Sequence, residues 1–375
     1  MRENGAQTKA SAAARFWSKL WNSPQPTIGV EISTQAVSVG RWSHGSAQIE
    51  TSAWKPVSAG AVEPSPLREN IQRPEEVQQA FAAALSSLGI LPNSPSPAHS
   101  ARRPTDAVLV IPDQAARLFV LHFDTFPEKP QEAYPLVKWR LKKSVPFDIE
   151  SAALSYFVRP AGNELQVVAV TTPQAVLQQY ETLAESFGFR PRWVTLSTLA
   201  SLELAETANL KDAPGGAAPA APAEGSNGKT PGLPGVLVAK YSPPGFTTAI
   251  LQGRHLRLFR TVKVDANGEG LLSPADVLEV LHPSVVYFQD NFEGALQQAY
   301  LCGLGENSAA IAEALEGEMH LKTAPLVQEQ HGGADADRSR WERHFAALLG
   351  VAREQTDREE RRVGKECRSR WSPYH

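Results

Sequence analysis

The sequence contains very little cysteine: of its 375 residues, only Cys302 and Cys367 carry a thiol. Two cysteines exclude a disulfide framework and a zinc site built from cysteines, and such sparing use of cysteine fits a reducing compartment. Cys302 lies in the apolar run AYLCGL and is therefore expected to be a buried strand residue.

Long apolar runs are also missing. The longest, such as AVLVI and GVLVA, have the length of a buried strand, whereas a membrane-spanning helix needs about 20 apolar residues. The net charge of -3 provides no excess of positive charge for nucleic acid. We therefore expect a globular chain that has no membrane-spanning helix within the given sequence and no nucleic acid partner.

Clustered catalytic or metal-ligating side chains do not stand out. The nine histidines are scattered, and we interpret His122, His255 and His282 as surface or packing residues. No Ser/His/Asp, Cys/His or metal-ligand spacing rises above chance. The composition, with 42% hydrophobic and 21% charged residues, is that of an ordinary globular protein, and the length suits two domains.

Residues 1–26 form an N-terminal segment of helical composition, KASAAARFWSKLWN being its central part. Its apolar side chains recur at helical spacing beside basic residues: Phe16, Trp17, Leu20 and Trp21. The pattern leaves two interpretations open, an interfacial membrane helix or a short helix docked on the body of the protein. A signal peptide is not expected, because no apolar core or cleavage site follows the charges.

Residues 359–375, EERRVGKECRSRWSPYH, resemble the translation of a sequencing adapter, and we exclude them from the fold. Cys367 is then not a natural residue. The natural chain is expected to continue beyond about Arg358, so a membrane-spanning segment after that point stays open.

The first part of the chain alternates strands and helices. TIGVEIS, AVSVGRW and AQIETSAW predict a β-meander. A helix is predicted from Arg73 to Gly89 because proline and glutamates favour its start and glycine its end. After the strand DAVLVIP, further strands alternate with helices that begin near Pro130 and at Pro173.

Residues 211–235 are rich in Ala, Pro and Gly without apolar periodicity and are predicted to be a disordered linker. Residues 236–353 then open with a second three-strand meander and end in the helix DRSRWERHFAALLGVARE. Two halves that begin alike indicate a weak internal duplication. The alternation of strands with helices predicts an α/β (α+β) fold.

Several segments together resemble the actin-like type IV pilus assembly proteins of the PilM family, relatives of the division protein FtsA and of type II secretion protein L. IGVEIST resembles the family's first phosphate strand, and LCGLGENSAAIAEAL its adenosine-side glycine loop and helix. VKWRLKKSVPFDIESAALSYFV resembles the helix, turn and strand of its inserted subdomain. The block Lys138–Val158 is the most specific part of a resemblance that covers nearly the whole chain.

The resemblance implies a two-lobed actin-like ATPase fold. The implied parts are lobe one (27–113), an inserted subdomain (114–190), a return to lobe one (191–210) and lobe two (236–353). Lobe two is expected to be reduced, because only DANGEGLLS stands where the family usually carries a helical roof over the nucleotide.

The resemblance also implies nucleotide contacts at Gly29, Glu31, Ser33, Thr34, Gly303 and Gly305. The family's first loop carries Asp, then Gly, then Ser or Thr, and a later Lys. In this chain Glu31 is longer by a methylene, Ser33 adds a Cβ where backbone should approach phosphate, and Ser38 removes the cation.

The second phosphate loop, Asp-x-Gly in the family, falls at AKYSPPG. Lys240 and Ser242 replace the carboxylate and the glycine, and Pro243 and Pro244 lack the backbone N–H groups that would face phosphate. We therefore expect a degenerate site that does not hydrolyse ATP, with binding of Mg-ATP as the less favoured state.

The family's inserted subdomain borders a groove for the cytoplasmic tail of a bitopic PilN-like partner, which implies partner contacts at Lys138, Arg140, Pro146 and Phe147. The basic run KWRLKK is interpreted first as a solvated helix face and second as a patch for phospholipid or an acidic partner.

The expected function is a non-catalytic scaffold at the cytoplasmic face of the bacterial inner membrane. The sequence does not distinguish a pilus (twitching) machine from competence or secretion machinery. Two alternatives stay open: an ATP-binding actin-like switch, and the cytoplasmic domain of an L-type secretion protein. Self-association and peripheral membrane contact are compatible with each of these hypotheses.

Overall fold

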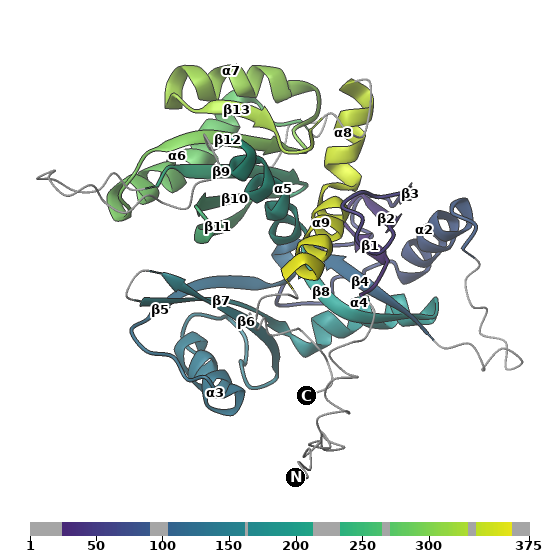
Figure 1. Ribbon diagram of the computed structural model, residues 1–375. Coiled ribbons are helices and arrows are strands. Elements are labelled where there is room, and N and C mark those ends of the chain that lie inside the picture. Colours follow the sequence, from purple (N-terminus) through teal and green to yellow (C-terminus); the bar gives the residue numbers. More distant parts are fainter. Residues whose placement is uncertain are drawn as a thin grey trace, which may run out of the picture.

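The computed structural model describes residues 25–90, 104–161, 164–212, 233–264, 271–328 and 335–361. The predicted N-terminal helix, most of the predicted linker and most of the adapter-like tail lie outside these ranges. The described residues form three β-sheets with helices between and around them (Figure 1).

The first five-stranded sheet has the order β3-β2-β1-β4-β8. Its strands are β1 (Ile28–Ile32), β2 (Ala36–Arg41), β3 (Thr51–Pro56), β4 (Thr105–Ile111) and β8 (Phe189–Leu196). The predicted meander forms one half, and β1 pairs in parallel with β4 on its other side. All residues of β1 are buried, because helices cover both faces of the sheet. We term this sheet and its helices α2 (Pro74–Ser87) and α4 (Gln174–Ser186) lobe one.

The second five-stranded sheet has the order β11-β10-β9-β12-β13 and repeats the arrangement of the first. Its strands are β9 (Gly235–Ser242), β10 (Gly245–Gln252), β11 (His255–Lys263), β12 (Leu296–Cys302) and β13 (Lys322–Pro325). Again a meander is followed by two parallel strands, as the internal duplication predicts. Its helices are α6 (Pro274–Asn291), which starts with a capping box from Ser273 to Asp276, and α7 (Ser308–Met319). This unit is termed lobe two.

The third sheet, β5-β7-β6, carries the helix α3 (Pro130–Leu141) and is termed the subdomain. Its strands are β5 (Arg117–Phe123), β6 (Ala152–Ala161) and β7 (Glu164–Pro173). Alternate residues face opposite sides of the sheet: Val167 and Ala169 pack with α3, whereas Val168 packs with the core between the lobes. The helix begins at Pro130, as predicted, and ends at Leu141, so residues KKSVPF lie in the turn that follows it.

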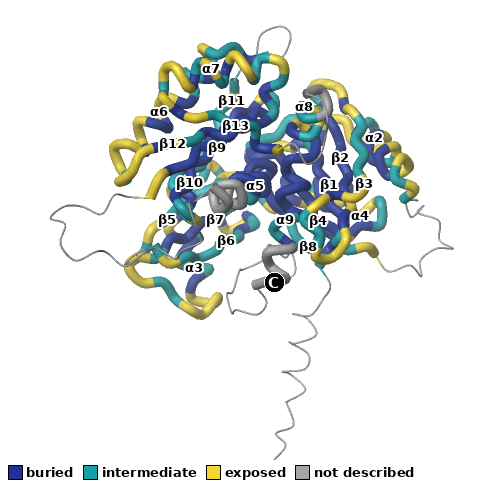
Figure 2. Tube along the Cα trace, turned by 45° about the horizontal axis from the view of Figure 1, so that its top comes forward, coloured by how far each residue is buried: buried dark blue, intermediate teal, exposed yellow. Residues whose placement is uncertain are grey.

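Two helices, α5 (Ser197–Asp212) and α9 (Ala346–Arg361), pack together between the two large sheets. Figure 2 shows their described parts in the buried centre of the molecule. They approach closely at Gly350, where an added Cβ would lie 2.0 Å from the backbone oxygen of Ala200. The crossing therefore requires a residue without a side chain at position 350.

The predicted C-terminal helix is divided at Phe345 into α8 (Asp335–His344) and α9. Backbone hydrogen bonds continue across the junction, from Phe345 to Trp341 (2.9 Å) and from Leu349 to Phe345 (2.8 Å). The His344 ring stacks on that of Trp54 in β3, with ring centroids 4.0 Å apart. The end of α8 is thus held against lobe one.

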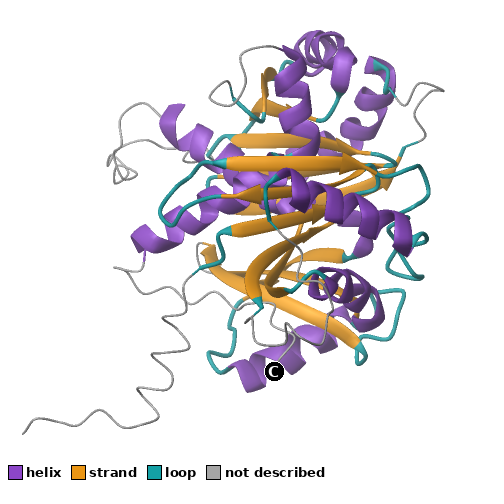
Figure 3. Ribbon diagram, turned by 90° about the vertical axis from the view of Figure 1, so that its right-hand side faces the viewer, coloured by secondary structure: helices purple, strands orange, loops and turns teal. Residues whose placement is uncertain are grey.

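Figure 3 shows the strands in the middle of the molecule with helices on either side. Within the described ranges, no helix is both long enough and apolar enough to cross a membrane. The same residues contain no group of three His, Cys, Asp or Glu side chains placed to hold a metal ion.

Candidate functional site

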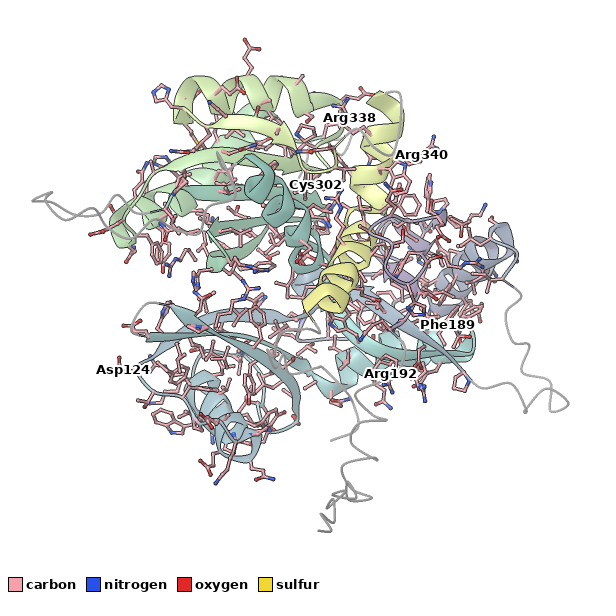
Figure 4. The ribbon with its side chains drawn as sticks, viewed as in Figure 1. Asp124, Phe189, Arg192, Cys302, Arg338 and Arg340 are labelled. Atoms are coloured by element: carbon pink, nitrogen blue, oxygen red, sulfur yellow. The ribbon has the colours of Figure 1, made fainter. Side chains whose placement is uncertain are left out.

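The predicted phosphate residues lie where the lobes meet, a region termed the lobe interface. Glu31 lies near the end of β1, Ser197 begins α5, and Lys240 lies near the end of β9. Cys302 ends the neighbouring strand β12 and lies near the centre of the molecule in Figure 4. Cys302 is fully buried, as predicted, and burial raises the pKa of its thiol to about 12.

Lys240 fills the centre of the lobe interface. Its side chain reaches from lobe two to the first turn of α5, and the residue is only 3% exposed. The Nζ donates to Ser197 Oγ (2.8 Å), Ser201 Oγ (2.9 Å) and the Ser197 backbone oxygen (3.2 Å). An ammonium group has three N–H donors, and here each has an acceptor.

Glu31 completes this network from the side of lobe one. Ser197 Oγ donates to Glu31 Oε1 over 2.5 Å, so one hydroxyl joins the buried carboxyl to the ammonium of Lys240. Burial raises the pKa of Glu31, and Lys240 and the hydrogen bond from Ser197 act in the opposite direction. The cation that the sequence lacks at Ser38 is therefore supplied to Glu31 from the other lobe.

The turn between β9 and β10 makes further contacts with lobe one. The hydroxyl of Thr34 donates to the backbone oxygen of Pro243. Gly245 lies against Gln114, whose amide nitrogen would be 1.2 Å from an added Cβ. The segment that the resemblance assigns to phosphate thus binds the opposite lobe directly.

Asp113 forms a second polar connection between the lobes. This buried carboxylate follows β4 and accepts a hydrogen bond from the hydroxyl of Thr247 in β10 (2.8 Å). It also accepts from Thr198 at the start of α5, through the backbone N–H (2.9 Å) and the hydroxyl. Because both oxygens have donors, the carboxylate is satisfied within the protein.

The predicted adenosine loop is occupied by the chain itself. Gly303 has φ +77°, and an added Cβ would lie 2.4 Å from the backbone oxygen of Tyr241, so this close approach requires glycine. The N–H of Gly303 donates to Glu342 Oε2 of α8 over 3.3 Å. Gly305 also has a positive φ, +65°, and faces Arg343 of α8.

Two other predicted nucleotide residues have local structural roles. Ser33 closes the turn between β1 and β2, because its hydroxyl donates to the Ala36 backbone oxygen (2.9 Å) and accepts from the Ala36 N–H (3.0 Å). Gly29 leaves room for the side chains of Leu348 and Trp42, each 2.8 Å from the position of an added Cβ. Gly29 therefore permits α9 to pack on β1.

These groups do not fit a bound metal-phosphate. Such a ligand needs a free carboxylate near the metal and backbone N–H groups toward the phosphates. Glu31 already accepts from Ser197, Lys240 already donates to two serines, and Pro243 and Pro244 have no N–H. The lobe interface is arranged as an internal hydrogen-bond network.

The predicted partner residues lie on the subdomain, away from the lobe interface. Lys138 of α3 donates to the backbone and side-chain oxygens of Glu150 (3.3 and 3.4 Å), which holds the helix to the turn after it. Phe147 is half-buried against the core of the subdomain. Arg140 and Pro146 are exposed.

A cavity of about 130 Å³ lies between the subdomain sheet, α5 and the β10–β11 hairpin. Ser155, Phe157 and Arg159 of β6 line it, whereas Leu154 and Val158 pack in the core on the side of α3. Its apolar wall includes Phe157, Val168, Val170 and Leu199, and its charged rim includes Arg159, Glu203, Arg254 and Glu354. The subdomain also bonds to lobe two here, since Gln166 Nε2 donates to the Leu256 backbone oxygen over 3.0 Å.

Comparison with solved structures supports the two-lobed architecture. The chain is similar to a protein chain in the structure "PilM-PilN type IV pilus biogenesis complex", with a TM-score of 0.63 and 16% sequence identity over 89% of this chain and 99% of that chain. The fold is actin-like. The duplicated five-stranded sheets correspond to the two lobes that the sequence resemblance implies.

Two further similar structures are more distant. One is a Bacteroides thetaiotaomicron protein described as having an actin-like ATPase fold and unknown function, with a TM-score of 0.45 and 11% identity over 88% of this chain and 97% of that chain. The other is the cytoplasmic domain of EpsL, an inner-membrane component of the Vibrio cholerae type II secretion system, with a TM-score of 0.42 and 10% identity over 91% and 96%. No protein-family model and no curated protein matches the chain.

Sequence reasoning missed Ser197, Ser201 and Asp113 as members of the actin-like lobe interface. A partial signal exists, because Ser197 and Thr198 stand directly before the apolar pattern of α5, and such hydroxyl residues are frequent at helix starts. Nothing local indicates that Ser197 contacts Glu31, which is 166 residues away.

Proposed function

We propose that this actin-like protein is a non-catalytic scaffold of a bacterial inner-membrane assembly platform of the pilus or secretion type. We further propose that it works at the cytoplasmic face of that membrane and binds the cytoplasmic tail of a PilN-like bitopic protein. The similarity to the PilM-PilN complex over most of both chains supports this choice among the functions that actin-like folds serve.

One observation carries the non-catalytic part of the proposal: Lys240 occupies the position that the resemblance assigns to a phosphate-loop carboxylate and is hydrogen-bonded to Ser197 and Ser201. An ATPase of this fold needs an acidic group there to hold the hydrated metal. Mg-ATP would have to displace the ammonium group and separate Thr34 from Pro243 before it could bind.

A thermal melt with and without Mg-ATP tests this point. We expect no shift of the unfolding midpoint at millimolar Mg-ATP. A ligand present at a hundredfold excess over its dissociation constant adds about 2.7 kcal/mol to the free energy of unfolding, which raises the midpoint by at least a couple of degrees. An actin-like ATPase run in parallel serves as the positive control. A reproducible rise would instead favour an ATP-binding switch.

The cavity beside the subdomain is the proposed seat of the partner tail. An extended peptide binds through backbone contacts and inserts side chains into apolar pockets. The wall formed by Phe157, Val168 and Leu199 suits one apolar side chain. This position lies on the opposite face of the subdomain sheet from the residues Lys138 and Phe147 that the sequence singled out.

Filling the cavity tests this position. Ser155 lines the cavity from β6, so Ser155→Phe places a ring where the peptide side chain would insert. We expect this variant to bind a labelled synthetic peptide copying the tail of a PilN-like protein at least about tenfold more weakly, measured by fluorescence anisotropy. Ser87→Phe, at an exposed position of α2, is the matched control. Unchanged affinity in Ser155→Phe, with a loss in Arg140→Ala, would locate the tail beside α3 instead.

A further inference from the structure

The outer face of α3 carries an unusual exposed aromatic residue. Trp139 is 71% exposed, more than any other large hydrophobic side chain among the described residues. Burying a tryptophan removes a large apolar area from water, so an exposed indole on an ordered helix is left without the stabilisation that burial provides. The inner face of α3 holds the helix in place through buried Ala133, Val137 and Leu141.

Exposed positive charge follows this indole directly along the chain. Arg140, Lys142 and Lys143 are all exposed at the end of α3 and in the turn after it. No carboxylate in the described part of the chain forms an ion pair with any of them, whereas Lys138 on the same helix is paired with Glu150. The pKa of the exposed Asp148 is lowered by hydrogen bonds from Glu150 and Ser151 and, to a smaller extent, by Lys142. Positive charge therefore predominates over the face.

Trp139, Arg140, Lys142 and Lys143 are termed the α3 face. Figure 1 shows α3 on the outer side of its sheet at one end of the molecule. Residues 142–144, in the turn after the helix, are exposed as well.

We propose that the α3 face is a peripheral membrane contact that binds anionic phospholipid. Tryptophan favours the level of the lipid headgroups because its ring is apolar and its N–H is polar. Flexible cations beside it gain from the negative surface potential, each by about fivefold in binding. The combination of a protruding indole with three cations matches a flat, negatively charged surface with an apolar layer beneath it. This inference does not depend on the tail-binding proposal.

Vesicle sedimentation of the full chain tests the inference. The probe is phosphatidylserine/phosphatidylcholine vesicles, compared with pure phosphatidylcholine vesicles. We expect Arg140→Ala/Lys142→Ala/Lys143→Ala to weaken binding to the anionic vesicles by at least about tenfold. Trp139→Ala is expected to weaken it several-fold, and Trp139→Phe to keep most of it. The N-terminal segment is identical in each variant, so differences between the variants report on α3.

Two matched control variants show whether vesicle binding depends on the α3 face itself or only on net charge or on any exposed apolar side chain. Arg41→Ala/Arg117→Ala/Lys322→Ala removes three exposed cations from other strands, and Leu67→Ala removes an exposed apolar side chain from lobe one. Both are expected to bind vesicles as the wild type does. The proposal is overturned if the α3 triple variant also binds like the wild type. It is equally overturned if the wild type ignores the vesicles but binds polyglutamate, since the partner would then be an acidic protein.

Discussion

Replacing Lys240 by methionine is expected to lower the free energy of unfolding by roughly 3–5 kcal/mol, because a buried carboxyl then loses the cation that is linked to it through the Ser197 hydroxyl. The substitution keeps the length and packing of the side chain but removes the ammonium group. Glu31 then loses its nearby cation, and the hydroxyls of Ser197 and Ser201 lose a donor. Urea unfolding followed by circular dichroism measures the difference.

A double variant shows whether this loss of stability comes from the interaction between Glu31 and Lys240. Glu31→Gln/Lys240→Met leaves neutral groups of similar shape, so we expect most of the lost stability to return. Lys322→Met, at an exposed position of β13, controls for the chemical change and is expected to stay within about 0.5 kcal/mol of the wild type. If Lys240→Met were as stable as the wild type, the ammonium would not be buried between the lobes, and the case against a nucleotide site would fail.

Replacing Glu342 by glutamine is expected to stabilise the protein at pH 8 by roughly 2–3 kcal/mol and to change little at pH 5. Glu342 is 6% exposed, and burial raises its pKa to about 7, against the opposing hydrogen bond from Gly303 and the charge of Arg338. The folded form therefore holds a proton over a pH range in which the unfolded chain has released it. The stability that this group contributes is fully present below about pH 4.5 and is lost as the pH rises through about 7.

Glutamine is the informative replacement because its side-chain oxygen can still accept from Gly303 while carrying no charge at any pH. Burial and then nearby arginines lower the pKa of His344 to about 4. The stability that His344 contributes is therefore lost as the pH falls below about 6.5, which is opposite to the trend for Glu342. His344 is present in both proteins, so its contribution cancels in the difference between them.

Glu316→Gln provides a control whose effect on stability is expected to be the same at pH 5 and at pH 8. The pKa of this exposed carboxyl is lowered by hydrogen bonds from Thr323, so its contribution to stability is present above about pH 4.5 and is lost as the pH falls. Thermal melts at pH 5 and pH 8 measure all three proteins. Equal differences between wild type and Glu342→Gln at the two pH values would contradict the assigned burial of Glu342.

Connections between the lobes support the choice of a scaffold over a switch. Nucleotide-driven switching requires two arrangements of comparable stability that the ligand distinguishes. In this chain Lys240, Thr34 and Asp113 connect the lobes from one side, and Gln166 connects the subdomain to lobe two from the other. Several hydrogen bonds would have to break together for the lobes to separate.

Most of the elements could be predicted from local patterns. The meander beginning at Ile28 and its counterpart beginning at Gly235 follow from short apolar runs separated by turn residues, and the helix after Arg73 from proline and glutamate at its start. The assignment of the two meanders to two lobes came from the resemblance, because hydrophobic periodicity and composition do not show how distant elements pack together. The division of the C-terminal helix at Phe345 was not predicted, because packing decides where a helix ends.

In the candidate site, too, some features follow from residue identity and others only from the packing. The prediction of a degenerate phosphate loop rests on residue identity alone, since a lysine cannot replace a metal-holding carboxylate and a proline has no N–H, whatever surrounds them. What Lys240 does instead could not be read from the chain, because its acceptors Ser197 and Ser201 lie about 40 residues away in sequence. Only the packing of α5 between the two sheets brings an ammonium, two hydroxyls and a buried carboxyl within hydrogen-bond reach, and the cost of leaving any of them unpaired in a dry interior holds them together.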